Sequence, residues 1–308
     1  MTILVAGGTG TLGTLLVRRL SDRGVPVRVL TRDPARAKHL GGRSVEVVRG
    51  DVRDAASLTP ALEGIDLVVS AVHGFAGPGG VSPASVDRRG NVNLIDAAMQ
   101  VGAAVVLMSV VGAAPDSAID LFRAKHDAEQ HLRQSGLRWT ILRSTAFIET
   151  WAGVMGTPLR TTGKTMVFGR GDNPINFVSA IDVAALLEIA VLDPDLRGQI
   201  IELGGSRNLT FNQVVPMLEE VVGRRGSVRH IPRGMLRAMA IVMSKVKPEL
   251  ARQARAALVM DTHDMSFDAA ATRRTFSSLP DTHLATALRS YFDTNDQKTG
   301  SDTSDSRV

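Results

Sequence analysis

The sequence predicts an α/β fold: a doubly wound parallel sheet with helices on both faces, followed by a smaller C-terminal lobe. The chain opens with an apolar, β-branched run at residues 3–6, which is long enough for a buried parallel strand. A glycine-dense turn follows, and then leucines recur at helical spacing from residue 12. This alternation of apolar strand and helix continues to about residue 150, as in consecutive βα units. We expect further strands at 25–30, 45–49, 67–72, 105–109, 139–143 and 200–203, with helices at 85–101, 121–134 and 181–192.

The opening turn matches two versions of one fingerprint. Gly8, Gly10 and Gly13 fit G-x-G-x-x-G, whereas Gly7, Gly10 and Gly13 fit the looser G-x-x-G-x-x-G. In a Rossmann-type domain such glycines allow a tight turn, the approach of a pyrophosphate and close packing of the helix on the strand. The first helical amides, at Thr11 and Leu12, would then receive the phosphates. The alternative is an ordinary strand-to-helix turn.

Composition indicates a globular chain without thiol chemistry. The 308 residues are 44% hydrophobic and 22% charged, and there is no cysteine. There is no apolar run long enough to span a membrane and no leading signal segment, so we expect a cytoplasmic protein without membrane contact. The formal charge of +5 is interpreted as dispersed, which argues against nucleic-acid binding. The scattered histidines predict no metal site, and no G-x-S-x-G elbow indicates a hydrolase.

The end of the second strand bears on the choice between NADP and NAD. Arg32 stands just beyond it, and no carboxylate occupies its last positions. An arginine there suits the 2′-phosphate of NADP, whereas a carboxylate would hold the ribose of NAD. The sequence therefore favours NADP, although Asp33 keeps NAD open. Asp51 and Val52, after the third strand, would bracket the adenine ring; the alternative for Asp51 is a turn aspartate that caps the next segment.

Small and polar residues at later strand ends predict the rest of the site. Ser70 and Ala71 would let the cofactor lie against the sheet edge. Ser109 would sit beside the nicotinamide and hydrogen-bond a substrate oxygen, or else simply cap its strand. Lys125 lies on the following helix, one turn before Glu129; the alternative to a functional role is a surface pair between these two. His73 is given no catalytic role.

The pattern loosens after residue 150. We expect a Rossmann core over 1–150, to which segments around 176–203 return, a substrate or cap lobe over 151–293, and a disordered tail over 294–308. The Met-rich helical stretch 232–260 is either core or a pliable substrate lid.

Taken in order, these segments resemble the atypical short-chain dehydrogenase/reductases, specifically the NmrA-like group that includes isoflavone-reductase-like and quinone- or dye-reducing proteins. The resemblance implies an NADP-favouring Arg32, strand ends at Ser70–Ala71 and Ser109 that flank the cofactor, and a substrate lobe. The residues that carry it are GGTGTLG at 7–13, TRDP at 31–34, GNVNLIDAA at 90–98, SGLRWTILR at 135–143 and FVSAIDVA at 177–184.

One departure from that family affects the chemistry. Typical short-chain dehydrogenases use Tyr-x-x-x-Lys, but with Lys125 as the lysine the tyrosine position holds Leu121, and the only tyrosine of the chain is Tyr291. The phenol mechanism is therefore absent. By resemblance, Lys125 would hold the nicotinamide ribose or protonate a substrate oxygen, provided that burial lowers its pKa. Phe147 and Phe177 are expected as apolar walls of the substrate pocket.

These features predict an NADP-dependent reductase of a quinone, an azo dye or a conjugated carbonyl, acceptors that need less help with protonation. The competing prediction is a regulator that senses NAD(P) and binds a protein partner without turnover. A nucleotide-sugar epimerase ranks last because it needs the missing tyrosine. A homo-oligomer is compatible with either leading prediction.

Overall fold

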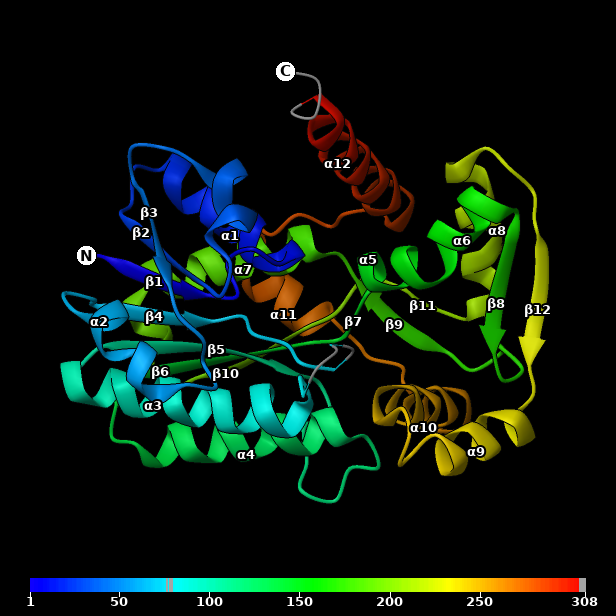
Figure 1. Ribbon diagram of the computed structural model, residues 1–308, viewed down its shortest axis with the longest axis horizontal. Coiled ribbons are helices and arrows are strands. Elements are labelled where there is room, and N and C mark those ends of the chain that lie inside the picture. Colours follow the sequence, from blue (N-terminus) through cyan, green and yellow to red (C-terminus); the bar gives the residue numbers. More distant parts are fainter. Residues whose placement is uncertain (76, 78–79, 305–308) are drawn as a thin grey trace.

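The computed structural model describes residues 1–75, 77 and 80–304. Its larger part is built around a seven-stranded, all-parallel sheet (Figure 1). Its order is β10-β6-β5-β4-β1-β2-β3. The order reverses beside β1, the point at which doubly wound sheets bind ligands at their carboxyl ends. The strands are β1 (Ile3–Ala6), β2 (Val27–Thr31), β3 (Val45–Arg49), β4 (Leu67–Ser70), β5 (Ala104–Val110), β6 (Trp139–Ser144) and β10 (Ile200–Leu203).

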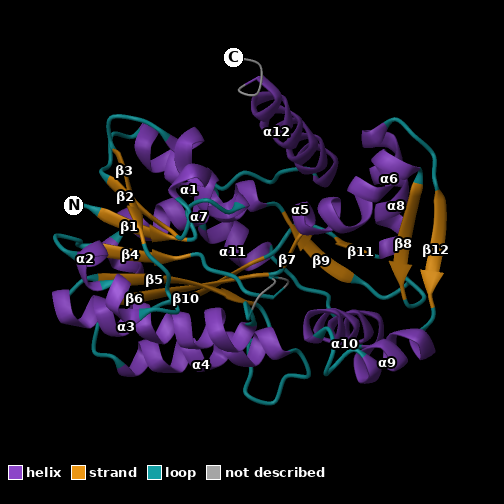
Figure 2. Ribbon diagram, in the orientation of Figure 1, coloured by secondary structure: helices purple, strands orange, loops and turns teal. Residues whose placement is uncertain are grey.

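Helices cover both faces of this sheet, as Figure 2 shows. On one face, α1 (Thr11–Asp22) and α7 (Ala180–Leu192) enclose an apolar core with the strands. On the other, α2 (Thr59–Leu62), α3 (Arg89–Val101) and α4 (Asp120–Gln134) enclose a second core. A π-helical turn, η3 (Pro83–Arg88), runs directly into α3. The predicted doubly wound fold is confirmed.

The central strands β1, β4 and β5 are almost entirely apolar because both of their faces are covered, whereas the edge strand β3 is partly exposed and contains Glu46 and Arg49. The predicted bounds of the strands in this sheet differ from the observed ones by at most two residues, and those of β1, β3 and β10 are identical. β2 begins two residues later than expected and includes Thr31, while β4 ends at Ser70 instead of residue 72. Two residues beyond the end of β4, the carbonyl oxygen of Val72 accepts a hydrogen bond from the Lys125 ammonium group.

The remaining chain builds a lobe with its own apolar core. It contains a three-stranded sheet ordered β11-β9-β7 and a parallel pair, β8 and β12. Its strands are β7 (Ala146–Phe147), β8 (Lys164–Phe168), β9 (Ile175–Val178), β11 (Asn208–Leu209) and β12 (Ser227–Ile231); its helices are α5 (Ile148–Trp151), α6 (Thr157–Thr162), α8 (Phe211–Val222), α9 (Arg233–Val242), α10 (Pro248–Thr262) and α12 (Leu284–Ser304).

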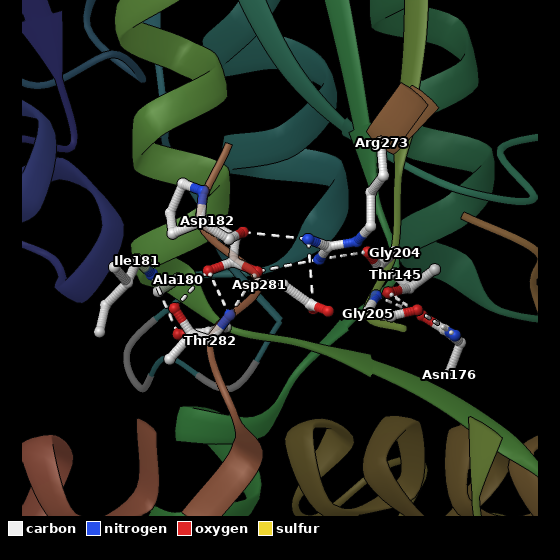
Figure 3. A network of polar contacts seen from close by, with 12 residues as sticks. Thr145, Asn176, Ala180, Ile181, Asp182, Gly204, Gly205, Arg273, Asp281 and Thr282 are labelled. Carbon is white, nitrogen blue, oxygen red and sulfur yellow. Dashed lines mark hydrogen bonds and ion pairs between the residues drawn. The ribbon is translucent and has the colours of Figure 1, made fainter. Parts of the chain in front are cut away.

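A buried polar network ties the late chain to the end of β10 and the start of α7 (Figure 3). The Asp182 carboxylate is 1% exposed; its Oδ2 lies 2.9 Å from Nη2 of Arg273, and Oδ1 accepts the Thr282 hydroxyl hydrogen at 2.5 Å. The same Arg273 nitrogen donates to the carbonyl oxygen of Gly204 at 2.9 Å. This network fixes α11 (Ala270–Thr275) against the sheet.

For residues 294–304, which the sequence predicted to belong to a disordered tail, the structure shows a helix. Helix α12 continues to Ser304, and residues 305–308 lie outside the described part of the chain. The segment can remain helical because residues 284–304 contain no proline and a single glycine, Gly300.

Candidate functional site: the carboxyl ends of β1, β4 and β5

The glycine turn after β1 leaves no room for side chains at Gly7 and Gly13. Gly7 has φ of 87°, and a Cβ atom there would lie 2.5 Å from the carbonyl oxygen of Ala71. A Cβ atom on Gly13 would lie 2.2 Å from the carbonyl oxygen of Gly7. Gly7 therefore makes the tight turn, and Gly13 lets α1 pack on it. Gly8 has a different constraint, because its Cβ would lie 2.9 Å from Val29 Cγ1.

The start of α1 suits an anionic ligand. Its N-cap, Gly10, provides no side-chain hydrogen bond, and the first turn holds no acidic residue. A Cβ atom on Gly10 would meet only the carbonyl oxygen of Gly7, at 3.3 Å. The helix end therefore keeps its partial positive charge without a protein counter-charge. The amides of Thr11 and Leu12 in this first turn fit a pyrophosphate.

The predicted adenosine region places two cations near one carboxylate. Arg32 is exposed just after β2. Asp51 is held by Arg53, whose Nη2 lies 2.6 Å from Asp51 Oδ2. The hydrogen bond from the Arg53 side chain is the main reason why the pKa of Asp51 is below its ordinary value, and Arg32 acts in the same direction. An adenine amine would have to share this carboxylate with Arg53. The neighbouring Val52 is 8% exposed and packs in the core.

Lys125 is buried in an ion pair that the sequence did not reveal. The side chain is 3% exposed as a residue; its Nζ lies 3.1 Å from Asp87 Oδ1 and donates to the Val72 carbonyl oxygen at 3.1 Å. The alternative of a surface pair between Lys125 and Glu129 is therefore wrong.

Asp87 connects this pair to the loop after β4. It is fully buried on η3, and its Oδ2 accepts the Gly74 amide hydrogen at 2.8 Å. Nδ1 of His73 lies 3.7 Å from Oδ1. Burial acts to raise the pKa of Asp87, but the positive charge of Lys125, with contributions from His73 and Gly74, brings that pKa below its ordinary value. Asp87 is thus the carboxylate that holds Lys125 in place. The only sequence signal for it was its position on the helix that follows the loop after β4.

Ser109 lies in a second buried network. Its hydroxyl donates to the carboxylate of Glu129, which is 1% exposed. Arg143 of β6 binds the same carboxylate through Nη2 at 2.6 Å and reaches Glu202 through Nη1 at 3.1 Å. The hydrogen bond with Glu129 raises the pKa of Arg143. To donate to a substrate oxygen, the Ser109 hydroxyl would have to leave Glu129.

Ser70 and Ala71 occupy the predicted strand end. The Ser70 hydroxyl is buried and donates to Asn91 Oδ1 at 2.5 Å, and Asn91 Nδ2 donates to the Asp87 carbonyl oxygen at 2.6 Å. Ser70 therefore supports the turn that carries Asp87. Ala71 packs directly against Gly7, because its carbonyl oxygen would lie 2.5 Å from a Cβ atom on Gly7.

The positions expected for a phenol and for pocket walls are apolar and mostly internal. Leu121 is 9% exposed one turn before Lys125 on α4, whereas Tyr291 belongs to α12, where its ring packs on Phe292. Phe147 is half-buried in β7. Phe177 is fully buried, with its ring 5.9 Å from that of Phe211. The expectation that Phe177 lines a substrate pocket is therefore wrong, because the ring fills the core of the C-terminal lobe.

Helix α10 of that lobe meets the loop after β4. Nη2 of Arg252 lies 3.4 Å from the Phe75 carbonyl oxygen and 3.3 Å from that of Val81. Nη2 of Arg255 lies 3.3 Å from Asp120 Oδ2 at the start of α4. The lobe is thus attached beside the Lys125 ion pair. Among the residues that the structure describes, no group of histidines and carboxylates could hold a metal ion, and no helix is long and apolar enough to cross a membrane.

Comparison with known proteins gives consistent relatives. The chain is 30% identical over 248 residues to an NAD(P)H azoreductase of Xenophilus azovorans, covering 80% of this chain and 82% of the relative. It is 31% identical over 241 residues to the photosystem II assembly factor Ycf39 of Synechocystis sp., covering 78% and 73%. The crystal structure of the Escherichia coli NADPH-dependent quinone oxidoreductase QOR2 with NADPH matches with a TM-score of 0.74 at 22% identity, over 94% of this chain and 99% of that one, which shows a shared fold. Residues 1–269 match the model of the NmrA-like family, and the chain belongs to that family.

Proposed function

We propose that this chain is an NADP-dependent oxidoreductase that reduces a quinone-, azo dye- or enone-like small molecule. The observation that carries the proposal is the uncapped start of α1 behind the compressed glycine turn, which fits a dinucleotide pyrophosphate. The similarity to an azoreductase and the fold shared with a quinone oxidoreductase support the reaction class.

In this proposal the amides of Thr11 and Leu12 hold the pyrophosphate, and Arg32 pairs with the 2′-phosphate. The bound cofactor supplies the hydride. Asp87 holds the Lys125 ammonium group at the end of β4, where that group binds the nicotinamide ribose or offers a proton to a substrate oxygen. No phenol takes part, because Leu121 occupies the tyrosine position. That absence favours acceptors whose reduced form is stabilised by conjugation.

The cofactor proposal is tested by calorimetric binding of NADPH and NADH to the wild type and to Arg32→Ala. Loss of a charge-assisted contact with phosphate would weaken NADPH binding about 10- to 100-fold and leave NADH binding unchanged. Arg18→Ala, an exposed arginine on α1, is the matched control and should bind both nucleotides as the wild type does. Equal weakening of both nucleotides by Arg32→Ala would contradict the phosphate role.

The reaction is tested by NADPH oxidation with a panel of one quinone, one azo dye and one enone. We expect turnover with at least one of these acceptors. Tight NADPH binding without turnover of any acceptor would overturn the reductase proposal and leave cofactor binding intact.

The second candidate is a non-catalytic NAD(P)-binding regulator that binds a protein partner. The similarity to Ycf39, which is an assembly factor, favours it, and so does the missing phenol. A pull-down that depends on added NADPH, together with a negative acceptor panel, would support this function over the reductase.

A further inference from the structure

The most exposed aliphatic side chains of the described residues gather in α9 and the segment after it. Ile241 is 74% exposed, Val246 73% and Val242 61%, and Met235 adds a further 46%. Outside this segment, no large hydrophobic residue in the described part of the chain exceeds the 58% of Met1. Exposed apolar groups that cluster in this way indicate a contact surface rather than chance exposure.

The packing of α9 explains why these residues are exposed. Leu236 and the neighbouring Met239 and Ala240 face α10, where they pack with Ala254 and Ala257. Residues 235, 241 and 242 lie on other sides of the helix, so their side chains cannot reach that core. α9 lies at the edge of the C-terminal lobe, away from the large sheet (Figure 1). The helix therefore has one packed apolar face and one unpartnered apolar face.

The same region carries a concentrated positive charge. Residues 221–248 hold seven arginines and lysines and no aspartate or glutamate, whereas the whole chain has a formal charge of +5. The remainder of the chain is therefore net negative, and the expectation of a dispersed positive charge is wrong. Arg237, Lys245 and Lys247 are exposed beside Ile241 and Val246. Arg233 is already paired, with Nε 2.5 Å from Asp261 Oδ2.

We propose that α9 and residues 243–248 dock on the surface of an anionic phospholipid bilayer. Ile241, Val242 and Val246 would enter the boundary between headgroups and acyl chains, while Lys245 and Lys247 contact lipid phosphates. Apolar and cationic groups on one short amphipathic segment are the features by which helices lie in a membrane interface without crossing it. The proposal replaces the expectation of a chain without membrane contact.

Other occupants fit these observations less well. A second copy of the chain in a symmetric contact would bring the lysines of one patch against those of the other. Nucleic acid would use the cations but not the aliphatic side chains, and residues 221–248 contain no phenylalanine, tyrosine or tryptophan on which bases could stack. A bilayer with anionic headgroups satisfies both the charge and the apolar surface.

Flotation of the full chain with vesicles tests the proposal. We expect binding to phosphatidylcholine vesicles that contain phosphatidylglycerol, little binding to phosphatidylcholine alone, and weaker binding as salt is raised. Lys245→Glu with Lys247→Glu should reduce the partition coefficient at least about 20-fold, because each cation near an anionic surface contributes about fivefold. Ile241→Asp with Val242→Asp should reduce it to a similar extent by removing the inserted apolar groups.

Two double variants elsewhere serve as controls. Met99→Asp with Val101→Asp changes two exposed apolar residues at the end of α3, and Arg18→Glu with Lys38→Glu reverses two exposed charges. Both should bind vesicles as the wild type does.

Three results would overturn the proposal. The first is equal binding to neutral and anionic vesicles, or binding that is retained by both the Lys245/Lys247 and the Ile241/Val242 double variants. The second is heparin binding that matches vesicle binding and is unaffected by the Ile241 and Val242 changes, which would indicate a general polyanion site. The third is a dimer, seen by light scattering, that the Ile241 and Val242 changes abolish and that accounts for the exposed face.

Discussion

Replacement of Asp87 by asparagine tests whether the buried ion pair with Lys125 organises the site. Asp87 is fully buried, and Lys125 is 3% exposed. In Asp87→Asn the amide oxygen can still accept the Gly74 hydrogen, but the ammonium group loses its counter-charge and keeps only the Val72 carbonyl oxygen. Removing one partner of a buried pair costs about 3–5 kcal/mol. This would be a large share of the roughly 5–15 kcal/mol that stabilise a folded domain.

A double-mutant cycle isolates the pair itself. Lys125→Met leaves the Asp87 carboxylate with the Gly74 amide and a His73 ring nitrogen 3.7 Å away. The double variant contains neither charge, so we expect it to be more stable than the sum of the single losses implies, by about 1–3 kcal/mol. The measurement is equilibrium urea unfolding at neutral pH, followed by circular dichroism. Additive losses, to within about 0.5 kcal/mol, would refute the coupling.

The same pair predicts an acid limb of stability. The folded-state pKa of Asp87 is lowered from an ordinary value of 3.8, so its contribution is fully present above that value and is lost as the pH falls through the folded-state pKa. Asp87→Asn lacks this contribution at every pH. The stability difference between the wild type and the variant should therefore shrink as the pH falls below about 4. A difference that stays constant down to the acid transition would contradict this assignment.

Further substitutions test the glycine turn after β1, the core of the C-terminal lobe and the buried carboxyl group of Glu149. Gly13→Ala should abolish NADPH binding and lower stability because its Cβ would lie 2.2 Å from the Gly7 carbonyl oxygen. Gly234→Ala, in the first turn of α9 with nothing within 4 Å of its Cβ, should leave NADPH binding unchanged and should not lower stability in urea unfolding. Phe177→Ala should cost about 3–5 kcal/mol of unfolding free energy, as for a large core residue, and leave NADPH affinity unchanged; unaltered stability would disprove its place in the core. Glu149 is a buried residue of α5 whose Oε1 accepts hydrogen bonds from the Ser179 hydroxyl and the Ala180 amide. Burial raises its pKa above the ordinary value of 4.5, so its contribution to stability is lost as the pH rises through the folded-state value. Glu149→Gln, whose amide oxygen can accept the same hydrogen bonds, should therefore raise the melting temperature at neutral pH but not in acid. An equal change in melting temperature at both pH values would count against an ionised Glu149.

The sheet could be predicted because its strands are short, mostly apolar runs rich in β-branched residues, each followed by a turn, even where the edge strand β3 is partly exposed. The ends were less certain, since they depend on which group takes the last carbonyl oxygen. Just beyond the end of β4, the Val72 carbonyl oxygen accepts from the Lys125 ammonium, which lies 53 residues further along the chain. Sequence pattern alone does not contain such a contact.

Aromatic and Met-rich stretches could not be interpreted beyond their hydrophobicity. Phe177 has the same apolar character whether it faces a substrate or, as observed, other aromatic rings of the core. In α9, the helical spacing did not distinguish a packed face from an exposed one, because both faces are apolar. Only the position of α10 decides that Leu236 is buried and Ile241 is exposed.

The predictable and unpredictable parts of the candidate site differ in the range of their interactions. The phosphate-binding part consists of amides at the start of α1 and needs only glycines that are neighbours in sequence. The reactive part depends on partners that are distant in sequence: Asp87 for Lys125, and Glu129 with Arg143 for Ser109. Because Lys125 Nζ has three N–H donors and two of its contacts are with Asp87 and Val72, one donor remains for a cofactor or substrate, whereas the Ser109 hydroxyl can donate to a substrate only by leaving Glu129. The Asp87 pair therefore fixes the position from which Lys125 presents that remaining donor.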